Sequence, residues 1–394
     1  MNILYTNFHT KNGGGHTSYI IALAKSLATH HRVVIATPGG SELHDRAPGE
    51  AGVTVVPVDF KPRLRYLASS LWQLRRMICT GQFDVVHVNG SADHRQVMLA
   101  TAFMLRRPAI VFTKHNDHRV NSVGNWLRAI FGTHHSIAVS DYVASFMKGS
   151  AYRALTVVKH GVSSQSGHHP DLGEQWRPLR EARFAVSEAV DLPHIVLGST
   201  AGTGLHKGWM TLALALASLP AHQRAHFSVL LAGELPSDAT LAELAAMNVR
   251  EQFHFTGHIT DKNVVLGCSD VAFVLSHKET LSYACRESMS AGLPVLISSS
   301  GGLPENIDDG VEGWIVPSGD AVTVADTLRQ MLADPARLRR MGEAARTRSI
   351  EQFAMQDFVE RTQSVYAVAM AAVRWRWQWR MRAIRVRTKS SWPA

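Results

Sequence analysis

Short apolar runs alternate with amphipathic stretches along the first 140 residues of the chain. Six of these runs are strand-like, at 2–8, 32–38, 53–59, 84–90, 109–115 and 136–140. Helical patterns lie between most of them. Strands that alternate with helices predict a parallel sheet covered by helices on both faces, the α/β class.

The same alternation returns after residue 193. Apolar runs lie at 194–200, 227–234, 253–258, 270–276, 294–299 and 313–317, and the pattern of 321–349 predicts two helices. Between the two series, "SSQSGHHPDLGEQWRP" (163–178) is polar and rich in turn residues. The sequence therefore predicts two doubly wound, Rossmann-like domains at 1–165 and 194–352, joined by a linker at 166–193. Such domains bind ligands at the carboxyl ends of their strands, and we expect a cleft between them.

The end of the chain has a different composition. A C-terminal helix is expected at 353–373, packing back toward the N-terminal domain, and a basic aromatic tail at 374–394. Eight basic residues and no acidic residue follow Glu360. Without these eight, the chain has 33 basic and 32 acidic residues, so the net charge of +9 is a property of the tail.

The tail "RWRWQWRMRAIRVRTKSSW" (374–392) interleaves arginine with tryptophan. As an extended strand it places Trp375, Trp377 and Trp379 on one face, and as a helix it places Trp375 beside Trp379. Either arrangement suits an anionic membrane surface. Nucleic-acid binding through stacking and a disordered terminus are the alternatives. The near-neutral body favours the membrane, and nucleic acid is not expected as a partner.

The overall composition is ordinary for a soluble globular protein, with 45% hydrophobic and 19% charged residues. Cys79, Cys268 and Cys285 show no CxxC spacing, so a reducing compartment is expected. The start "MNILYTNF" lacks the pattern of a signal peptide. The apolar run at 366–373 is too short for a bilayer, which takes about 20 residues. We therefore expect a cytoplasmic protein.

Two glutamates lie in "SHKETLSYACRES" (276–288), after a strand-like run. If a helix begins near Leu281, Glu279 precedes it and Glu287 lies about two turns inside. The unsatisfied N–H groups of a helix N-terminus suit a phosphate, and carboxylates on either side could accept hydrogen bonds from sugar hydroxyls. The alternative is that Glu279 caps the helix and Glu287 is solvated.

Residues 275–317 resemble the nucleotide-binding block of the retaining GT-B glycosyltransferases of the family 4 type (glycosyl transferases group 1). That family includes sucrose-phosphate synthase and many lipopolysaccharide and mannosyl transferases. The block reads, in order, Ser276, Glu279, Glu287, "SAGLPVL" (290–296), "GGLPE" (301–305) and "DGVEGWIVPSGD" (309–320). The likeness extends more weakly to "DVVHVNG", "TKHN", "IAVS" and "KHGV". It implies a GT-B architecture, with two Rossmann-like domains facing a cleft.

The resemblance also implies roles for residues of this block. Glu279 would hold hydroxyls of the transferred sugar, and Glu287 would hold the ribose. The backbone of Leu281, Ser282 and Tyr283 would face the diphosphate. Gly301, Gly302 and Glu305 would form a turn beside the ribose and the sugar, although Gly-Gly and Leu-Pro also form plain β-turns.

A second motif, "GTGLHKGW" (202–209), follows the first strand-like run of the second series. Lys207 matches the family's lysine, which neutralises the departing diphosphate; otherwise it is a surface residue at a helix start. Gly202 stands where the family has an arginine. Backbone N–H groups of the loop that holds Gly202 and Gly204 could replace this cation, and His206 and Arg286 are the other candidates.

In the first series, "NGGGHTSY" (12–19) opens a helix, and Gly14 and Gly15 allow close approach of the backbone to a ligand. This is not a GxGxxG motif, so NAD is not indicated. The resemblance places the loop against the donor phosphate and the acceptor, and His115 of "TKHND" beside the transferred sugar. The residues expected on the acceptor side are His16, Asn89, Asp93 and Asn116. His115 and His118 alone do not make a zinc site.

The resemblance therefore implies a retaining glycosyltransferase with no cofactor. The donor would be a nucleotide sugar, expected to be a UDP-sugar. The acceptor would be a glycolipid, a lipopolysaccharide core or another saccharide, at the inner face of the cytoplasmic membrane. No DxD-type metal motif is visible, because Asp308 and Asp309 match the family's Asp-Gly turn; metal independence is expected. The alternatives are a sugar-nucleotide epimerase of the same fold and a degenerate protein that binds sugar nucleotides or glycans.

Overall fold

The computed structural model describes the chain apart from residues 11–13, 62, 164–191 and 390–394, and apart from the side chains of Leu64 and 375–389. The chain divides into two units. The first comprises Met1–Lys159 and Phe358–Ala394, and the second comprises His160–Asp357. Most of the predicted linker lies outside the described residues. A ligand cleft between the two units stays a prediction.

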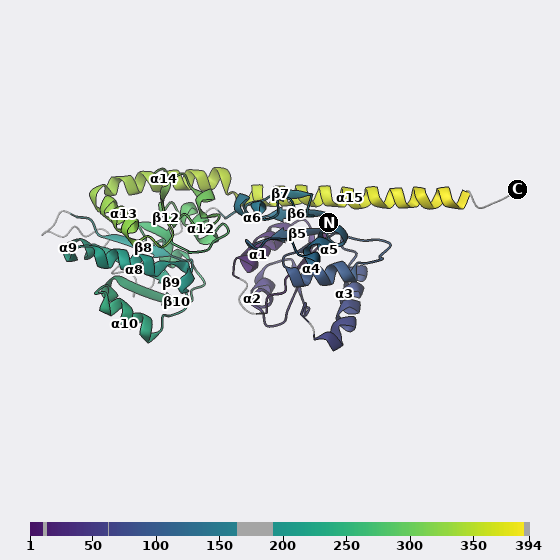
Figure 1. The fold of residues 1–394 in the computed structure, drawn as a ribbon, viewed down its shortest axis with the longest axis horizontal. Helices are drawn as coiled ribbons and strands as arrows, with labels where there is room; N and C mark the ends of the chain where they lie inside the picture. The colour runs from purple at the N-terminus through teal and green to yellow at the C-terminus, as the bar shows by residue number, and fades with distance from the viewer. Residues whose placement is uncertain (11–13, 62, 164–191, 390–394) are drawn as a thin grey trace. The chain divides into compact units, whose positions relative to one another are not determined.

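The first unit is built on a parallel sheet with helices on both faces (Figure 1). Its described strands are β1 (Asn2–Thr6), β2 (Arg32–Thr37), β3 (Val53–Pro57), β4 (Val85–Val88), β5 (Ala109–Lys114), β6 (His135–Ala138) and β7 (Leu155–Val157). They lie in the order β3-β2-β1-β4-β5-β6-β7. Every pairing is parallel and in register, for example Leu4 opposite Val34 on one side and opposite Val86 on the other. Strands buried on both faces explain the continuous apolar runs of the sequence.

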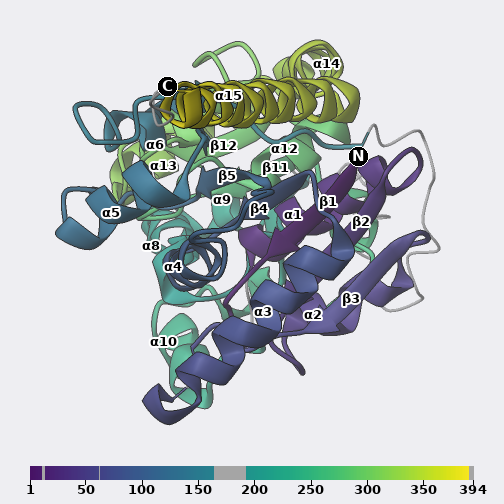
Figure 2. The same cartoon turned by 90° about the vertical axis from the view of Figure 1, so that its right-hand side faces the viewer.

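The helices of this unit are α1 (Gly15–Ala28), α2 (Glu42–Arg46), α3 (Leu67–Gly81), α4 (Ser91–Ala100), α5 (Val123–Gly132) and α6 (Asp141–Ser145). Short 3-10 turns lie at Ala47–Gly49 and Leu64–Tyr66. Serine hydroxyls cap several starts; Ser122 accepts from the Asn125 N–H, and Ser140 from the Val143 N–H. Helix α4 contacts both α3 and α5, and Figure 2 shows α4 nearly end-on beside α3.

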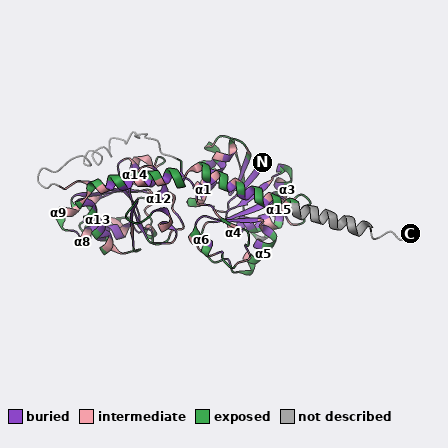
Figure 3. Cartoon of the chain, turned by 90° about the horizontal axis from the view of Figure 1, so that it is seen from above, coloured by how far each residue is buried: buried purple, intermediate pink, exposed green. Residues whose placement is uncertain are grey.

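The second unit repeats the design. Its described strands are β8 (Ile195–Ser199), β9 (Phe227–Ala232), β10 (Phe253–Gly257), β11 (Val271–Val274), β12 (Val295–Ser298) and β13 (Gly313–Val316), in the order β10-β9-β8-β11-β12-β13. Its helices are α8 (Trp209–Ser218), α9 (Ala221–Arg224), α10 (Asp238–Ala246), α11 (Asn263–Leu266), α12 (Tyr283–Ser290), α13 (Ala321–Ala333) and α14 (Pro335–Gln352). Short 3-10 turns lie at Leu205–Lys207, Arg250–Gln252 and Leu303–Asn306. The strands are buried and the outer helix faces are exposed (Figure 3).

The strand order reverses once in each sheet. The chain winds outward from β1 to β3 and then returns to place β4 on the other side of β1; β8 and β11 are related in the same way. Loops at the carboxyl ends of two such strands diverge and leave a crevice, where α/β sheets bind ligands. In this chain these are the loops after β1 and β4 in the first unit, and after β8 and β11 in the second.

The α/β class and the two parallel sheets predicted from the sequence are confirmed, and each predicted strand matches an observed one within a few residues. The sequence did not predict β7, which is only three residues long and not fully buried. The helix pair at 321–349 is observed as α13 and α14, separated at Asp334, whose carboxylate caps α14 by accepting from the Arg337 N–H.

The end of the chain forms one helix, α15 (Met355–Lys389), which crosses the expected boundary at 373 without a break. Tyr366 anchors this helix within the first unit. Its buried hydroxyl contacts Tyr5 Oη and His87 Nδ1, each at 2.7 Å. Phe358 packs edge-on against Tyr19, at 5.2 Å between ring centroids. The side chains of the predicted basic aromatic tail lie outside the described residues.

Candidate active site

The loop between β11 and α12 holds Glu279. Helix α12 begins at Tyr283, two residues later than expected, and Ser282 caps it by accepting from the Cys285 N–H at 3.3 Å. Ser282 has φ of 90° and ψ of 110°, a region that non-glycine residues rarely adopt. Such a conformation costs about 1–3 kcal/mol and is found mostly where function requires it.

Lys207 and Glu279 form an ion pair at the carboxyl edge of this sheet. Lys207 Nζ lies 3.1 Å from Glu279 Oε2, and their side chains are 24% and 17% exposed. The Glu279 carbonyl accepts from the Gly302 N–H at 3.1 Å. The structure thus brings together three predicted residues from the loops after β8, β11 and β12.

Glu287 lies on α12 and is also paired with a lysine. Lys262 Nζ lies 2.7 Å from both Glu287 Oε1 and Glu287 Oε2. Because the Glu287 side chain is 17% exposed, it is not the solvated helix residue of the alternative interpretation. Lys262, just before α11, was not predicted; a contact 25 residues away in the sequence leaves no local signal.

Arg286 was one of the candidates to replace the family's arginine, and this prediction is wrong. Its side chain is fully buried. Nε donates to Asn306 Oδ1 at 2.8 Å, Nη1 donates to the His160 carbonyl, and the guanidinium stacks 3.9 Å from the Phe353 ring centroid. Burial lowers the pKa of Arg286 to about 10. The residue therefore holds α12 to its neighbours rather than facing a ligand.

The "GGLPE" segment is not a plain β-turn. Leu303–Asn306 form a 3-10 helix, entered through Gly301 at φ of 59°. Asn306 Nδ2 donates to the carbonyls of Leu281 and Leu303 at 2.7 and 2.8 Å. This amide ties the turn that holds Gly301, Gly302 and Glu305 to the start of α12.

The loop after β8 is fixed by contacts of its own. Trp209 Nε1 donates to the Thr203 carbonyl at 2.7 Å. Gly208, at φ of 72°, has no room for a side chain, since a Cβ would lie 1.8 Å from the Leu275 carbonyl oxygen. Gly202, at φ of 96°, is different: a Cβ would meet nothing within 4 Å. The position expected for the arginine is therefore open, and a Cβ at Gly204 would touch the His206 ring at 2.7 Å.

In the first unit, three predicted residues meet beside the ends of β4 and β5. His115 Nε2 lies 3.1 Å from Asn89 Oδ1, and because that amide oxygen can only accept, the imidazole donates. The His16 and His115 rings are 4.1 Å apart between centroids. Asn89 Nδ2 donates to the Thr6 carbonyl at 3.2 Å. Burial lowers the pKa of His16 to about 3, so this imidazole is neutral at physiological pH.

Two other predicted residues of the acceptor side have different surroundings. Asp93 is wholly buried and cannot line a pocket; it accepts from Thr6 Oγ1 at 2.7 Å and from the Asn89 N–H at 2.9 Å. Burial raises its pKa to about 7. Asn116 Oδ1 accepts from Lys114 Nζ and from the His118 N–H. Asp93 therefore positions Asn89 through the hydrogen bond that it accepts from the Asn89 N–H.

The glycine loop of the first unit is described from Gly14 onward. Gly14 precedes α1 at φ of 49°, and its carbonyl accepts from the Ser18 N–H at 3.2 Å. A Cβ at Gly15 would meet nothing within 4 Å, so the start of α1 is open on that side. The loop follows β1, beside Asn89 at the end of β4, at the point where the strand order reverses.

Asp308 and Asp309 hold their own turn. Arg348 Nη1 donates to Asp308 Oδ2 at 2.8 Å, and Asp309 Oδ1 accepts from the Ile315 N–H at 2.8 Å. In the part of the chain that the structure describes, no three His, Cys, Asp or Glu side chains come close enough to hold a metal ion. Metal independence stays a prediction. Within the same residues, no helix has the length and apolar character needed to cross a membrane.

Two family models match the chain. "Glycosyl transferases group 1" matches residues 189–348, and "Glycosyltransferase Family 4" matches residues 13–166. N-acetyl-alpha-D-glucosaminyl L-malate synthase of Bacillus anthracis is 32% identical over 139 residues, 35% of this chain and 36% of that protein. The chain spans between 34% and 40% of the lengths of the first curated relatives.

Solved structures share the fold over almost the whole chain. HepE of Anabaena, solved with UDP, superposes with a TM-score of 0.78 at 18% identity, covering 93% of this chain and 100% of HepE. HepE has also been solved with UDP and glucose and with UDP-glucose. WaaG, a glycosyltransferase involved in lipopolysaccharide biosynthesis, superposes with a TM-score of 0.65 at 16% identity, covering 92% and 99% of the two chains. Together with the two family models, which match most of both units, these likenesses show that the chain belongs to the GT-B glycosyltransferases of the group 1 and family 4 type.

Proposed function

We propose that the protein transfers a sugar from a nucleotide diphosphate sugar, expected to be a UDP-sugar, to a saccharide or glycolipid acceptor. The observation that carries this proposal is the Lys207–Glu279 pair, at 3.1 Å, joined to Gly302 where the strand order of the second sheet reverses. A cation and a carboxylate at this edge suit a diphosphate and a sugar hydroxyl, respectively. The UDP and UDP-glucose complexes of HepE support uracil as the base.

In the proposed reaction, the bond between the anomeric carbon and the diphosphate oxygen breaks, and a bond to the acceptor oxygen forms. The proton of the acceptor hydroxyl passes to the departing diphosphate on the same face of the sugar, so configuration is retained. Lys207 would offset the charge that develops on this diphosphate. Glu279 would orient the sugar through its hydroxyls, and Glu287 would accept from the ribose hydroxyls. No cofactor or metal takes part.

In the first unit, His16 and Asn89 would supply acceptor-side contacts, and His115 would lie beside the transferred sugar as a catalytic residue. His115 already donates to Asn89 and lies against His16, so its ring is held in one orientation. A neutral His16 suits contact with sugar hydroxyls, because it brings no charge beside them. Gly14 and Gly15 would let the backbone approach both substrates.

The acceptor is proposed to be a glycolipid or a lipopolysaccharide core at the inner face of the cytoplasmic membrane. Two observations support this class. WaaG acts in lipopolysaccharide biosynthesis and shares the fold. The tail at 374–394 carries seven basic residues and four tryptophans, which suit an anionic membrane surface. The protein would then associate with that surface peripherally.

A thermal-shift screen of UDP-, GDP-, ADP- and CMP-sugars tests the donor, followed by measurement of nucleotide release with lipid acceptors. We expect stabilisation by one nucleotide class and acceptor-dependent release of its diphosphate. Epimerised donor without an acceptor would indicate the epimerase alternative, which no observation favours. Donor binding without turnover on any acceptor would indicate a degenerate binding protein.

A further inference from the structure

Helix α5 (Val123–Gly132) has its apolar side outward. Val123, Trp126, Leu127, Ile130 and Phe131 are between 37% and 75% exposed. At about 100° per residue they form one stripe about 140° wide. The buried side carries small residues, Ala129 and Gly132, and a Cβ on Gly132 would lie 3.0 Å from Met98 of α4. The helix therefore packs through its small residues and presents its large ones.

Two further large apolar side chains are exposed in the segment before β5. Phe103 is 100% exposed and Leu105 is 94% exposed. The segment is attached to α5, because Arg107 donates to the Phe131 carbonyl at the end of that helix. We call Phe103, Leu105 and the five apolar residues of α5 the α5 face. Exposed apolar surface of this extent usually marks an interaction site.

The stretch of chain that includes the α5 face is rich in basic residues. Residues 94–153 contain eight lysines and arginines, of which Lys114 is buried, and only two acidic residues, Asp117 and Asp141. Asp141 lies 2.9 Å from Lys159 in an ion pair. Arg106 and Arg107 follow Leu105 directly, and Arg128 lies on α5 beside the apolar stripe. An apolar stripe among cations is the pattern of a helix that lies in an anionic lipid interface.

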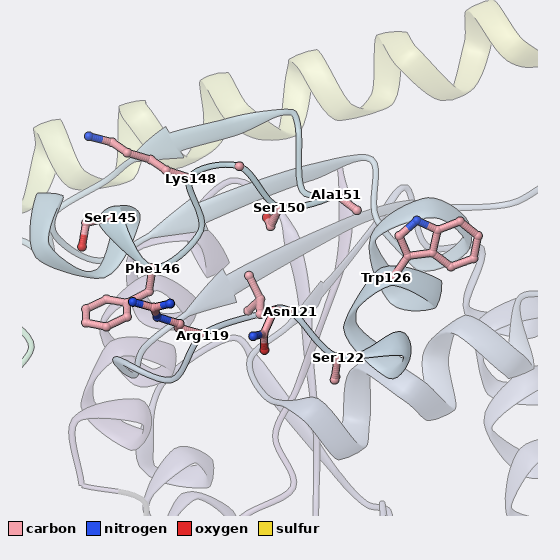
Figure 4. A pocket seen from close by; sticks show the side chains of 11 residues that line it. Arg119, Asn121, Ser122, Trp126, Ser145, Phe146, Lys148, Ser150 and Ala151 are labelled. Carbon is pink, nitrogen blue, oxygen red and sulfur yellow. The ribbon is translucent and has the colours of Figure 1, made fainter.

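A surface pocket of about 760 Å³ adjoins the α5 face. Trp126 lies at one end of it, and the side chains of Arg119 and Lys148 lie toward the other end, with Ser122 and Ser150 between them (Figure 4). Two cations toward one end of the pocket suit a phosphate head group, and the indole at the other end suits part of its chain.

We propose that the α5 face is a docking surface for an anionic lipid bilayer, with the adjoining pocket taking a phosphate head group. The surface is independent of the 374–394 tail. The indole of Trp126 would lie at the depth of the head groups, and the aliphatic side chains would reach the acyl boundary. Arg106, Arg119 and Lys148 would meet the lipid phosphates.

The test is sedimentation of the full chain with phosphatidylcholine vesicles, with and without phosphatidylglycerol. The Val123→Ser/Ile130→Ser variant removes two exposed aliphatic residues from the α5 face. Its matched control, Leu214→Ser/Val322→Ser, removes two from the second unit, where Leu214 and Val322 are 51% and 72% exposed. We expect roughly tenfold weaker binding to anionic vesicles for the first variant, because two apolar insertions are lost, and wild-type binding for the control.

Equal binding of the two variants would overturn the proposal. So would wild-type binding that does not depend on phosphatidylglycerol. The wild type could instead self-associate, and Val123→Ser/Ile130→Ser alone could abolish this association without changing vesicle binding. That result would assign the α5 face to a second copy of the chain. Circular dichroism of each variant verifies its fold, which is expected to survive because all four side chains are exposed.

A separate inference concerns Lys262 and rests on the proposed donor site. An ammonium bound to both oxygens of Glu287 fixes the orientation of that carboxylate. Each carboxylate oxygen keeps a lone pair for a further hydrogen bond. We infer that Lys262 is a positioning residue, which holds Glu287 ready for the two ribose hydroxyls and so favours ribose over 2′-deoxyribose in the donor.

The test compares dissociation constants of UDP and 2′-deoxy-UDP by titration calorimetry. Lys262→Met is expected to lower the preference for UDP roughly threefold or more, since a freely rotating Glu287 discriminates less well. Lys262→Arg is expected to restore it. Lys25→Met, which breaks the 2.9 Å Lys25–Glu50 pair of the first unit, is the matched control.

An unchanged preference in Lys262→Met would overturn this inference and leave the donor site standing. The preference for UDP over UMP is measured in the same way. If Lys262→Met changes only that preference, the lysine acts on the second phosphate and the inference is also overturned. If wild type shows no binding of UDP, GDP or ADP, the proposed function itself fails, and the inference fails with it.

Discussion

Replacing Lys207 by alanine tests the assigned role of the ion pair. At 3.1 Å, the gross attraction between Lys207 and Glu279 is about 5 kcal/mol at an effective dielectric of about 20. Desolvation of the two partly buried groups offsets most of it, and we expect a net loss of only about 1 kcal/mol in unfolding free energy. The fold should therefore survive the change.

The effect on catalysis should be larger than the effect on stability. If the ammonium acts on charge that develops as the diphosphate leaves, its loss should raise the activation free energy by about 3 kcal/mol and lower kcat about 100-fold. Removal of a single hydrogen-bond donor from an oxyanion site has an effect of this size. Donor affinity should fall much less, because the same charge is only partly expressed in the bound ground state.

The assay measures nucleotide release under single-turnover conditions, together with the dissociation constant of the donor. Lys159→Ala, which breaks the 2.9 Å Lys159–Asp141 pair of the first unit, is the control and should behave as wild type. Equal losses in kcat and in affinity for Lys207→Ala would show uniform binding and refute the assignment. No loss in either would return Lys207 to a surface role.

Three further predictions concern Gly202, Ser282 and the tail at 374–394. Gly202→Arg should raise kcat if the empty position leaves the diphosphate short of one cation, since no atom within 4 Å blocks a Cβ there; a fall in kcat would show that φ of 96° or a replacement group forbids it. Ser282→Gly should relieve the strain at φ of 90° and change the unfolding free energy by at most about 1 kcal/mol, because the lost cap of Cys285 offsets part of the gain; chemical denaturation measures this, and a loss above about 2 kcal/mol would contradict it. Deleting 374–394 removes seven of the eight basic residues after Glu360, and vesicle sedimentation should show weaker binding by about 1 kcal/mol per well-placed charge, with donor affinity unchanged; equal vesicle binding would contradict the membrane role of the tail.

The architecture could be predicted because a parallel sheet buries both faces of its strands, and buried strands leave continuous apolar runs such as 109–115. The grouping of Lys207, Glu279 and Gly302 was implied by the resemblance to the glycosyltransferases. It agrees with the sheet topology, because their loops follow strands β8, β11 and β12, whose carboxyl ends share one edge.

The side-chain partners could not be predicted in the same way. Arg286 was a candidate for a ligand contact, but it is buried against Phe353 and Asn306, which lie far from it in the sequence. The pairing of Lys262 with Glu287 is likewise non-local. Asp93 was expected to line the acceptor pocket and is instead wholly buried, where it accepts from the Asn89 N–H. Tertiary packing decides such contacts, and a single sequence does not record it.

The central claim is that the second unit binds a nucleotide diphosphate sugar through Glu279, Glu287 and Lys207. The most direct measurement is calorimetric titration of UDP into wild type and into Glu287→Ala. We predict saturable binding to wild type and at least roughly tenfold weaker binding to Glu287→Ala, the effect of about 1.4 kcal/mol expected when hydroxyls lose a charged acceptor. Equal affinity of the two proteins, or no binding of UDP, GDP, ADP or CMP to wild type, would contradict the claim.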